Sequence, residues 1–205
     1  MLNIIYIFSR FICFILVRVF FRLKVFYRYR IPRKGALIIA SNHASFLDPV
    51  ILGVVSPRVL NFIARDDLFL NRFFGTMISF MGAFPIKREG GSSGAFKEAL
   101  KRLKEQKALV IFPEGTRTKN GSLGKAHSGV GFLAARSEGI VIPVYIDGSD
   151  SALPRRRLFI RFKPIKVYFG KPLGYKDTTK IERRDAYQTF SDLVMENILV
   201  LKSNV

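Results

Sequence analysis

The hydrophobic pattern is densest at the start of the chain. Residues 1–25 are rich in Ile, Phe, Leu and Val, but three arginines interrupt them, so no uncharged stretch reaches the roughly 18–20 residues of a membrane-spanning helix. One arc of the helical wheel collects the polar residues of this stretch, namely Asn3, Arg10, Arg18, Arg22 and Lys24. The remaining face is almost wholly apolar. This pattern predicts a helix that lies in a membrane interface, and a core-packing helix is the alternative.

Beyond residue 30, short apolar runs alternate with amphipathic stretches. The runs predict strands at 36–40, 59–64, 83–86, 108–112, 140–146, 158–162 and 165–169. Helices are expected at 68–81, from Ser92 or Ser93 to Leu103, at 128–137, and from a capping box at Thr179 and Glu182 to about Val200. Loops are expected at 89–94 and 119–124. The alternation indicates an α/β fold with a mixed, partly parallel sheet flanked by helices.

These patterns divide the chain into two parts. We expect an N-terminal membrane-associating helical segment at residues 1–30, which ends in the basic run from Tyr27 to Arg30, and one α/β domain at residues 31–205. The helix expected at 68–81 carries four phenylalanines. It could pack in the core, line a tunnel for an acyl chain, or form a second membrane contact.

The net charge of the chain limits the classes of partner that it can bind. Lys and Arg total 34 against 15 Asp and Glu, a formal net charge of +19, although 49% of residues are hydrophobic. The positive charge requires an anionic partner. A nucleic-acid-binding protein is usually basic and polar, whereas a basic and hydrophobic chain fits an anionic lipid surface. The single cysteine, Cys13, excludes an internal disulfide and a multi-cysteine metal site.

One of only two histidines lies in a dense polar run. Residues 42–48 read NHASFLD, which places His43 directly after a predicted strand and Asp48 five positions later. A carboxylate on one ring nitrogen fixes the tautomer of a histidine and stabilises its protonated form, so the pair suits a general base. Asp48 could instead cap the helix that begins at Pro49. Asn42 and Ser45 are expected to shape the turn rather than act as nucleophiles.

A second run, FPEGTR, occupies residues 112–117 after another predicted strand. The guanidinium of Arg117 suits a phosphate, and Gly115 lets the backbone approach a ligand closely. The same letters are also ordinary turn composition. Together the two runs suggest a base that deprotonates a hydroxyl group beside a clamp for an anion.

The two runs carry a family resemblance. NHASFLD resembles the N-H-x-x-x-x-D signature of the glycerolipid acyltransferases, and FPEGTR resembles their second specific signature; the chain is most similar to the 1-acylglycerol-3-phosphate (lysophosphatidic acid) acyltransferases. Two weaker blocks, Gly82–Arg88 and Val141–Ile146, follow the order and spacing of that family. The resemblance spans about residues 35 to 147.

The resemblance implies roles for particular residues. His43 and Asp48 would be catalytic, and Arg117 would bind the phosphate of the acceptor. Glu114, Gly115 and Thr116 belong to the same substrate-binding signature, in which Glu114 and Gly115 would shape the site. The expected substrate-binding set also includes Arg88, which matches the arginine of a weaker block, and Arg65, which stands where many relatives have a lysine.

The implied reaction moves a fatty acyl group from a thioester on acyl carrier protein or coenzyme A to the free hydroxyl of 1-acyl-glycerol-3-phosphate, a lysophospholipid, giving phosphatidic acid. It needs no cofactor and no metal, and no nucleic acid is expected to bind. We expect a peripheral or monotopic protein on anionic lipid at the cytoplasmic face of a membrane. Glycerol 3-phosphate or another lysolipid is an alternative acceptor, and a basic membrane- or nucleic-acid-binding module without catalysis is the non-enzymatic alternative.

Other patterns suggest competing chemistry. Residues 90–94 read GGSSG and fit a nucleophile elbow, but three polar residues separate them from the preceding strand, so a loop and helix cap are favoured. His127 could join His43 and Asp48 around zinc, but the spacing matches no common metal motif. No nucleotide-binding fingerprint is present.

Overall fold

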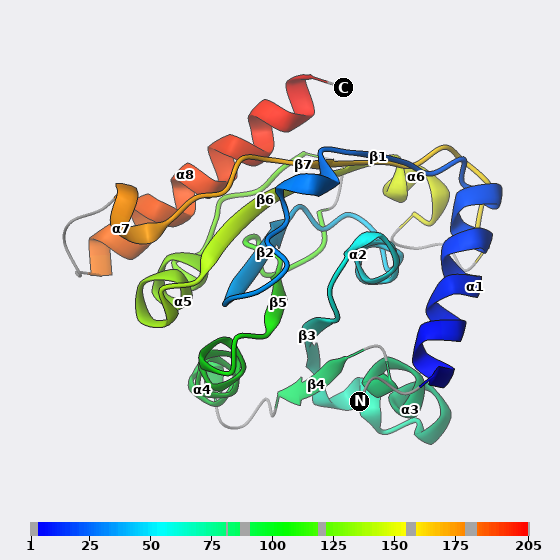
Figure 1. The fold of residues 1–205 in the computed structure, drawn as a ribbon, viewed down its shortest axis with the longest axis horizontal. Helices are drawn as coiled ribbons and strands as arrows, with labels where there is room; N and C mark the ends of the chain where they lie inside the picture. Colours follow the sequence, from blue (N-terminus) through cyan, green and yellow to red (C-terminus); the bar gives the residue numbers. More distant parts are fainter. Residues whose placement is uncertain are drawn as a thin grey trace.

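A computed structural model describes residues 4–80, 82–86, 91–118, 122–154, 159–178 and 184–204. Within these ranges, one seven-stranded sheet forms the middle layer (Figure 1). Its strand order is β1 (Lys24–Phe26), β7 (Lys166–Phe169), β6 (Ile140–Asp147), β2 (Leu37–Ser41), β5 (Ala108–Ile111), β3 (Leu60–Arg65) and β4 (Ala83–Ile86). Neighbouring strands are parallel except β6 and β7, which are antiparallel. The expected α/β fold with a mixed, partly parallel sheet is confirmed.

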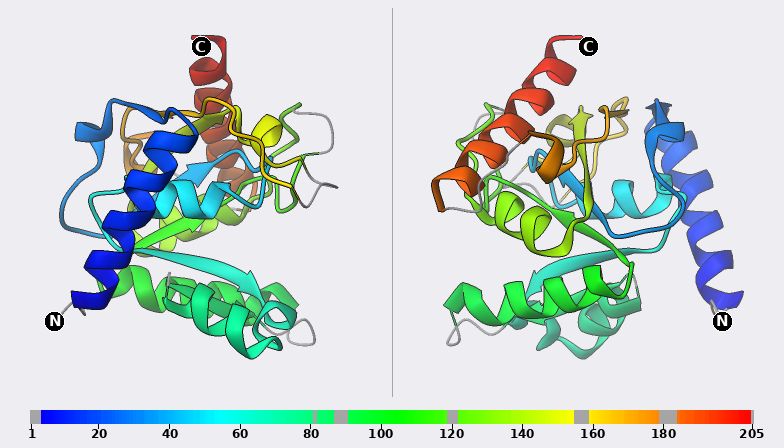
Figure 2. Two further views of the ribbon diagram at one scale, coloured as in Figure 1. Left: turned by 90° about the vertical axis from the view of Figure 1, so that its right-hand side faces the viewer. Right: turned by 60° about the vertical axis from the view of Figure 1, so that its left-hand side comes forward.

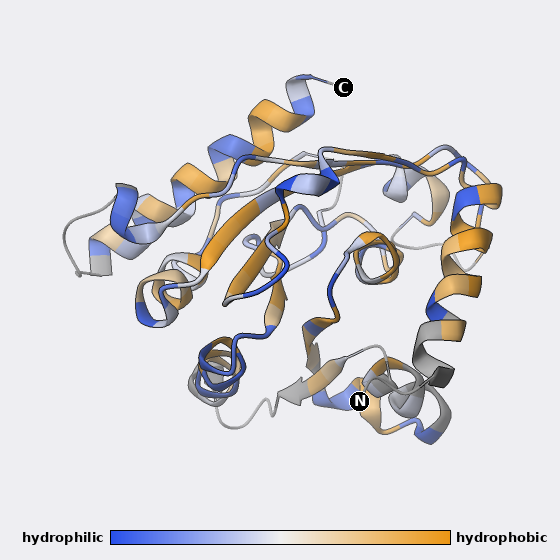
Figure 3. Ribbon diagram, viewed as in Figure 1, coloured by the Kyte–Doolittle hydropathy of each residue, from blue (hydrophilic) through white to orange (hydrophobic). Residues whose placement is uncertain are grey.

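The inner strands are apolar on both faces because both faces of the sheet are covered. Along β2, Leu37 and Ile39 join one core cluster, whereas Ile38 and Ala40 join the other. A strand with buried side chains on both sides reads as a continuous apolar run rather than an alternating one. Figure 3 shows β2, β5 and β6 as hydrophobic along their length.

Helices cover the two faces unequally. α1 (Ile4–Phe20) and α2 (Asp48–Val55) pack on one face, where Val17, Ile51 and Leu52 enter the core. α4 (Gly91–Lys104), α5 (Gly129–Ser137) and α8 (Arg184–Ser203) cover the other, where Leu103, Leu133 and Phe190 are buried. The remaining helices are η1 (Arg28–Arg30), η2 (Asp66–Phe69), α3 (Arg72–Phe80), α6 (Ser149–Ala152) and α7 (Tyr175–Thr178). The views in Figure 2 place α1 and α8 on opposite sides of the molecule.

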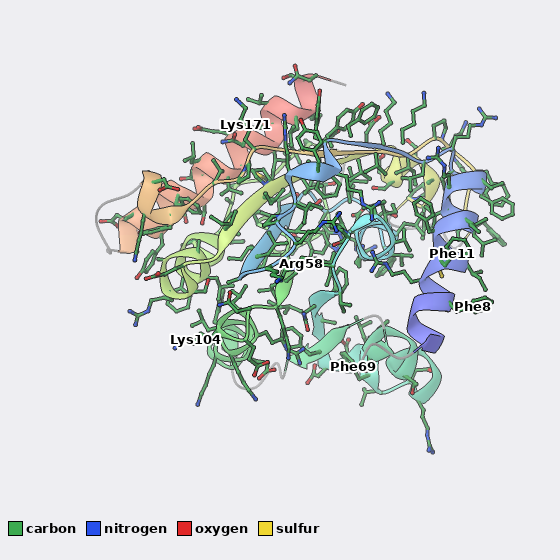
Figure 4. The ribbon with its side chains drawn as sticks, viewed as in Figure 1. Phe8, Phe11, Arg58, Phe69, Lys104 and Lys171 are labelled. Atoms are coloured by element: carbon green, nitrogen blue, oxygen red, sulfur yellow. The ribbon has the colours of Figure 1, made fainter. Side chains whose placement is uncertain are left out.

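Helix α1 leaves most of its apolar surface uncovered. At about 100° per residue, Phe14, Val17 and Phe21 fall in the arc that also carries the arginines, and these three pack against the domain. Much of the remaining surface of the helix is exposed, with Phe8, Phe11, Ile12, Ile15, Leu16, Val19 and Phe20 at 40% to 66% of their full accessibility. In Figure 4, Phe8 and Phe11 point away from the domain. Among the described residues, no helix has both the length and the apolarity required to cross a membrane.

Strand β1 ties α1 to the sheet. Lys24, Val25 and Phe26 pair in parallel with the first three residues of β7, and the ring of Phe26 stacks on Tyr168 with 4.6 Å between centroids. Nearby, Arg30 donates to the carbonyl of Phe169 at 2.9 Å. The basic run from Tyr27 to Arg30 is therefore partly occupied by contacts with the sheet. The predicted boundary at residue 30 stays a prediction, and this pairing lies on its N-terminal side.

Most predicted elements are found at or within a few residues of their expected bounds. The strand predicted at 158–162 is wrong, because residues 159–162 have no strand partner and are exposed. The loop predicted at 89–94 is wrong in part, since residues 91–94 form the start of α4. Residues 119–121 of the second loop and the capping box at Thr179 and Glu182 lie outside the described residues.

Candidate active site

His43 and the FPEGTR run lie together because they follow adjacent parallel strands. β2 and β5 pair in parallel from Leu37 with Ala108 to Ala40 with Ile111, so the segments that follow the two strands leave the sheet at the same edge. The amide of Thr118 donates to the carbonyl of His43 at 2.8 Å, and the His43 ring stacks on Phe112 with 3.9 Å between centroids. Carboxyl ends of parallel strands are the usual position of ligand sites in open α/β sheets.

The His43–Asp48 pair has the geometry of an oriented base. His43 Nδ1 lies 2.9 Å from Asp48 Oδ2, and this same oxygen accepts the backbone N–H groups of Ala44 at 2.7 Å and Ser45 at 2.8 Å. An oxygen that accepts hydrogen bonds from two backbone amides is deprotonated and acts as an acceptor. The proton of the His43–Asp48 hydrogen bond therefore resides on Nδ1, which donates the hydrogen bond to Asp48. The lone pair of His43 then resides on Nε2. Asp48 is fully buried, while the His43 side chain is 18% exposed.

Asp48 begins helix α2 but does not cap it. All three hydrogen bonds of Oδ2 come from residues that precede the helix, and Oδ1 has no partner among the described atoms. Pro49 follows at a position where a helix tolerates proline because the first amides have no partner within the helix. The carboxylate therefore serves the His43 turn rather than the helix end.

Asn42 and Ser45 hold this turn from both sides. The Asn42 side chain donates to the carbonyl of Ile146 at 3.0 Å and accepts the amide of the same residue at 2.8 Å, which extends the β2–β6 pairing by one step. Ser45 Oγ donates to the carbonyl of Leu153 at 2.9 Å. Both side chains are buried and fully engaged with backbone, consistent with the turn-shaping role expected of them.

Glu114 connects the two loops of the site. One carboxylate oxygen accepts the amide of His43 at 3.2 Å, and the other accepts the amide of Gly124 at 2.8 Å. The residue is 7% exposed. Glu114 therefore braces the His43 turn against the loop that follows FPEGTR. The expectation that it shapes the site agrees with this geometry, and its predicted contact with substrate stays a prediction.

Gly115 has a left-handed backbone, with φ of +67°. A Cβ atom at this position would lie 3.1 Å from Cδ2 of His127, so the turn and the imidazole are closely packed. The amide of His127 donates to the carbonyl of Pro113 at 2.9 Å. Glycine meets both the steric and the conformational demand of this turn. Gly115 and Thr116 are exposed at its tip.

The arginines expected to bind an anion occupy different positions. The guanidinium carbon of Arg117 lies 3.6 Å from the centroid of Phe46, which is the fifth residue of NHASFLD. Arg65 is the last residue of β3, and β3 ends at the same edge as β2 and β5 because all three are parallel. Arg88 lies outside the described residues. Sequence reasoning did not assign a role to Phe46, although an aromatic residue between the histidine and the aspartate of this motif is a usable signal.

The two competing kinds of site considered from the sequence are a metal site and a nucleophile elbow. Among the described residues, no cluster of three or more His, Cys, Asp or Glu side chains could hold a metal ion. Gly91 and Ser92 of the GGSSG pattern lie in the first turn of α4, and four residues separate the end of β4 from the start of this helix. The turn is therefore not the direct strand-to-helix connection that an elbow requires.

The family comparison agrees with this site. A protein family described as Acyltransferase matches residues 22–147, which include both loops. The chain belongs to this acyltransferase family.

Curated relatives extend the likeness over most of this chain. The chain is 27% identical over 183 residues to a 1-acyl-sn-glycerol-3-phosphate acyltransferase of Bacillus subtilis (strain 168), with 89% of each chain covered. It is 32% identical over 146 residues to the Streptococcus pneumoniae protein of the same description, and the match covers 70% of this chain and 52% of that one. The second match therefore spans only about half of the relative.

A solved structure shows the same fold. The acyltransferase superposes with a TM-score of 0.69 on the crystal structure of the 1-acyl-sn-glycerophosphate (LPA) acyltransferase of Thermotoga maritima, at 21% identity and with 88% of this chain and 72% of that chain covered. At this level of identity the likeness concerns the fold alone.

Proposed function

We propose that this acyltransferase moves a fatty acyl group from a thioester carrier to the free hydroxyl of 1-acyl-glycerol-3-phosphate, which gives phosphatidic acid. The observation that carries the proposal is the position of the His43–Asp48 pair beside the arginine-bearing turn on the next parallel strand. A base and an anion clamp at one strand edge suit a substrate that has both a hydroxyl and a phosphate group. The relatives named above support this choice of acceptor.

The proton path follows from the tautomer of His43. The acceptor hydroxyl donates its proton to Nε2 as its oxygen attacks the thioester carbonyl carbon. The carbon–sulfur bond then breaks, and the leaving thiolate takes the proton from the imidazolium. Asp48 stabilises the imidazolium and holds the ring in place, and such a positioned base contributes about 100- to 10,000-fold to the rate.

The phosphate-binding residues of the proposal are Arg117, Arg65 and Arg88, with Gly115 and Thr116 at the tip of the turn. Arg117 lies above Phe46, three residues from His43 in the sequence, so an anion held by its guanidinium is near the base. Arg65 stands at the same sheet edge. Positioning of a reacting group in this way can lower a barrier by several kcal/mol.

Membrane attachment is proposed to occur through α1. Its uncovered face presents seven large apolar side chains, whereas its arginines lie on the side that contacts the domain or beside it. A net charge of +19 favours an anionic surface, where each nearby basic residue contributes about 1 kcal/mol. We place the protein as a monotopic or peripheral enzyme at the cytoplasmic face. The carrier of the acyl group, acyl carrier protein or coenzyme A, is also anionic and is attracted by the positive electrostatic potential of the protein.

An acyl-transfer assay tests the function. The purified protein is given acyl carrier protein or coenzyme A thioesters with lysophosphatidic acid, glycerol 3-phosphate or lysophosphatidylcholine, and products are measured by mass spectrometry. Phosphatidic acid from wild type but not from His43→Ala is the expected result. Preference for another acceptor would contradict the assignment of lysophosphatidic acid, and no product with any acceptor would favour a non-catalytic binding module.

A further inference from the structure

A second exposed aromatic cluster lies on the segment that follows α6. Phe159 is 84% exposed, Ile160 49% and Phe162 64%, and the intervening Arg161 and following Lys163 are exposed as well. Single exposed apolar residues are ordinary on a protein surface, but three within four positions are not. We call residues 159–163 the aromatic segment.

The aromatic segment is held in place by its backbone. The amide of Arg161 donates to the carbonyl of Ala152 at 2.7 Å, and the amide of Lys163 donates to the carbonyl of Arg161 at 2.8 Å. Just beyond it, the amide of Ile165 donates to the carbonyl of Phe21 at 2.9 Å. The exposure of its side chains is thus a feature of an anchored segment.

The aromatic segment continues the uncovered face of α1. The ring of Phe162 stacks on Phe20 with 4.8 Å between centroids, and it meets Phe21 edge-on at 6.1 Å. Phe20 is itself one of the exposed residues of α1. Figures 1 and 2 both show the chain after α6 beside the C-terminal end of α1. One contiguous apolar surface therefore joins two parts of the sequence that are far apart.

Basic side chains accompany this surface. Arg161 and Lys163 lie beside the aromatic residues, and Arg22 and Lys24 are exposed just after the end of α1. No Asp or Glu occurs among residues 155–165 or 1–30. Apolar rings interleaved with cations match an anionic bilayer, in which the rings enter the acyl boundary and the cations meet phosphates.

From this arrangement we infer that the aromatic segment is a second membrane-inserting element, and that it enters an anionic bilayer together with α1. The two contacts together fix the orientation of the enzyme, whereas a single helix would leave rotation about its axis free. The segment is also linked to the catalytic turn, because Leu153, next to the anchor at Ala152, accepts the hydrogen bond from Ser45 Oγ. The depth of the segment in the bilayer therefore sets the position of His43 relative to the lipid surface.

The chain contains no tryptophan, so single tryptophans can report on each contact. Phe159→Trp probes the aromatic segment, Phe11→Trp probes α1, and Val200→Trp, at an exposed position on α8, is the control. Each full-length variant is mixed with vesicles of phosphatidylcholine and phosphatidylglycerol. The expected result is a blue shift of the emission and quenching by acyl-brominated lipid for Phe159→Trp and Phe11→Trp, and neither for Val200→Trp.

The outcomes separate this inference from the proposed attachment through α1. If Phe11→Trp is quenched while Phe159→Trp stays at its aqueous wavelength, α1 binds and the inference is overturned. If Phe159→Trp alone is quenched, the attachment through α1 fails, and the inferred joint insertion with α1 is overturned with it. If neither is quenched although the protein sediments with vesicles, both are wrong. A blue shift of Phe159→Trp without quenching would indicate a protein contact, and it would also overturn the inference.

A paired substitution gives a second readout. Phe159→Ser with Ile160→Ser should lower the vesicle partition coefficient roughly tenfold or more, because two apolar side chains no longer leave water. Leu199→Ser with Val200→Ser is the matched control on α8 and should leave the coefficient unchanged. The first pair should lower turnover of acceptor in vesicles while turnover of detergent-dispersed acceptor is unchanged. Equal partitioning of the two double variants would contradict the inference.

Discussion

The guanidinium of Arg117 lies over the ring of Phe46, 3.6 Å from its centroid, so the two signature loops meet through these side chains as well as through backbone. Phe46 is 58% exposed, which means that its ring contributes little to the core. Its position instead fixes the direction of the arginine that is proposed to bind the phosphate. Phe46 is therefore a positioning residue rather than a core residue.

Replacing Phe46 should weaken binding of the acceptor without affecting the chemical step. Phe46→Ala removes a cation–π contact of about 0.5–2 kcal/mol, which corresponds to a rise of roughly 2- to 30-fold in the KM for lysophosphatidic acid at unchanged kcat. Phe46→Tyr should restore the KM, whereas Phe46→Leu should not. If the leucine variant matches wild type, simple apolar contact rather than the aromatic face holds Arg117.

Replacing His43 should abolish turnover. His43→Ala is expected to lower kcat by about 100- to 10,000-fold, since the base that accepts the hydroxyl proton is lost. Asp48→Asn should be severe but milder, because an amide oxygen can still accept the amides of Ala44 and Ser45. Circular dichroism and vesicle binding should match wild type for both. More than about one per cent residual activity in His43→Ala would contradict a general-base role.

Replacing Arg117 should act through the phosphate of the acceptor. Arg117→Ala is expected to raise the KM for lysophosphatidic acid strongly and to leave any slow reaction with a monoacylglycerol, which lacks phosphate, largely unchanged. Arg117→Lys should recover only part of the loss, because a lysine cannot offer two parallel N–H groups. Lys104→Ala, an exposed charge on α4, is the control for a general loss of positive charge. Equal losses on both acceptors would argue against the clamp.

Glu114 should behave as a brace between two loops. Glu114→Gln places an amide nitrogen against the backbone N–H of His43 or Gly124, and leaving such a group unpaired costs about 1–3 kcal/mol. We expect a lower free energy of unfolding together with lower kcat, measured by denaturant titration and steady-state kinetics. Glu105→Gln, an exposed residue paired with Lys107, should change neither. A rise in KM alone, at unchanged stability, would indicate substrate contact instead.

Both ends of α1 should face the same side of a membrane. Single cysteines at Asn3 and Arg22, in a Cys13→Ser background, should react with an impermeant maleimide from the outside of vesicles to which the protein was added. Reaction of one end only, with the other accessible after lysis, would mean that the helix crosses. A loss-of-binding test is sharper with Phe8→Ser and Phe11→Ser than with deletion of residues 1–26, because the deletion also removes β1.

The sequence was a good guide wherever burial determined the pattern. Strands such as 108–111 and 140–147 lie in the middle of the sheet, and their unbroken apolar runs have no other stable position. The sequence was a poor guide where an apolar run has no neighbouring strand to pair with. Residues 158–162 form a mainly apolar run like that of a strand, yet the ring of Phe162 packs on Phe20, and residues 159–162 pair with no strand in the part of the chain that the structure describes. The three residues of β1 are too short to show a period.

The site was predicted unevenly for a similar reason. A histidine and a carboxylate with fixed spacing after a strand can be recognised from letters, because both the residue types and the turn are local. The contact of Glu114 with the amide of His43 and the contact of Arg117 with Phe46 depend on which strands become neighbours, and spacing along the chain does not contain that information. The distribution of buried residues around α1 also required the fold.

The parallel pairing of β1 with β7 has a consequence for how the protein folds during its synthesis. Lys24 pairs with Lys166, so the first strand made is among the last to find its place, after most of the chain has left the ribosome. Contacts between such distant positions form late, and until then neither the pairing of β1 nor the stacking on Phe162 supports α1. Because these contacts form late, the apolar helix α1 has time to reach a lipid surface while synthesis continues. The catalytic domain would then complete its sheet while α1 already holds it on the membrane that contains its substrate.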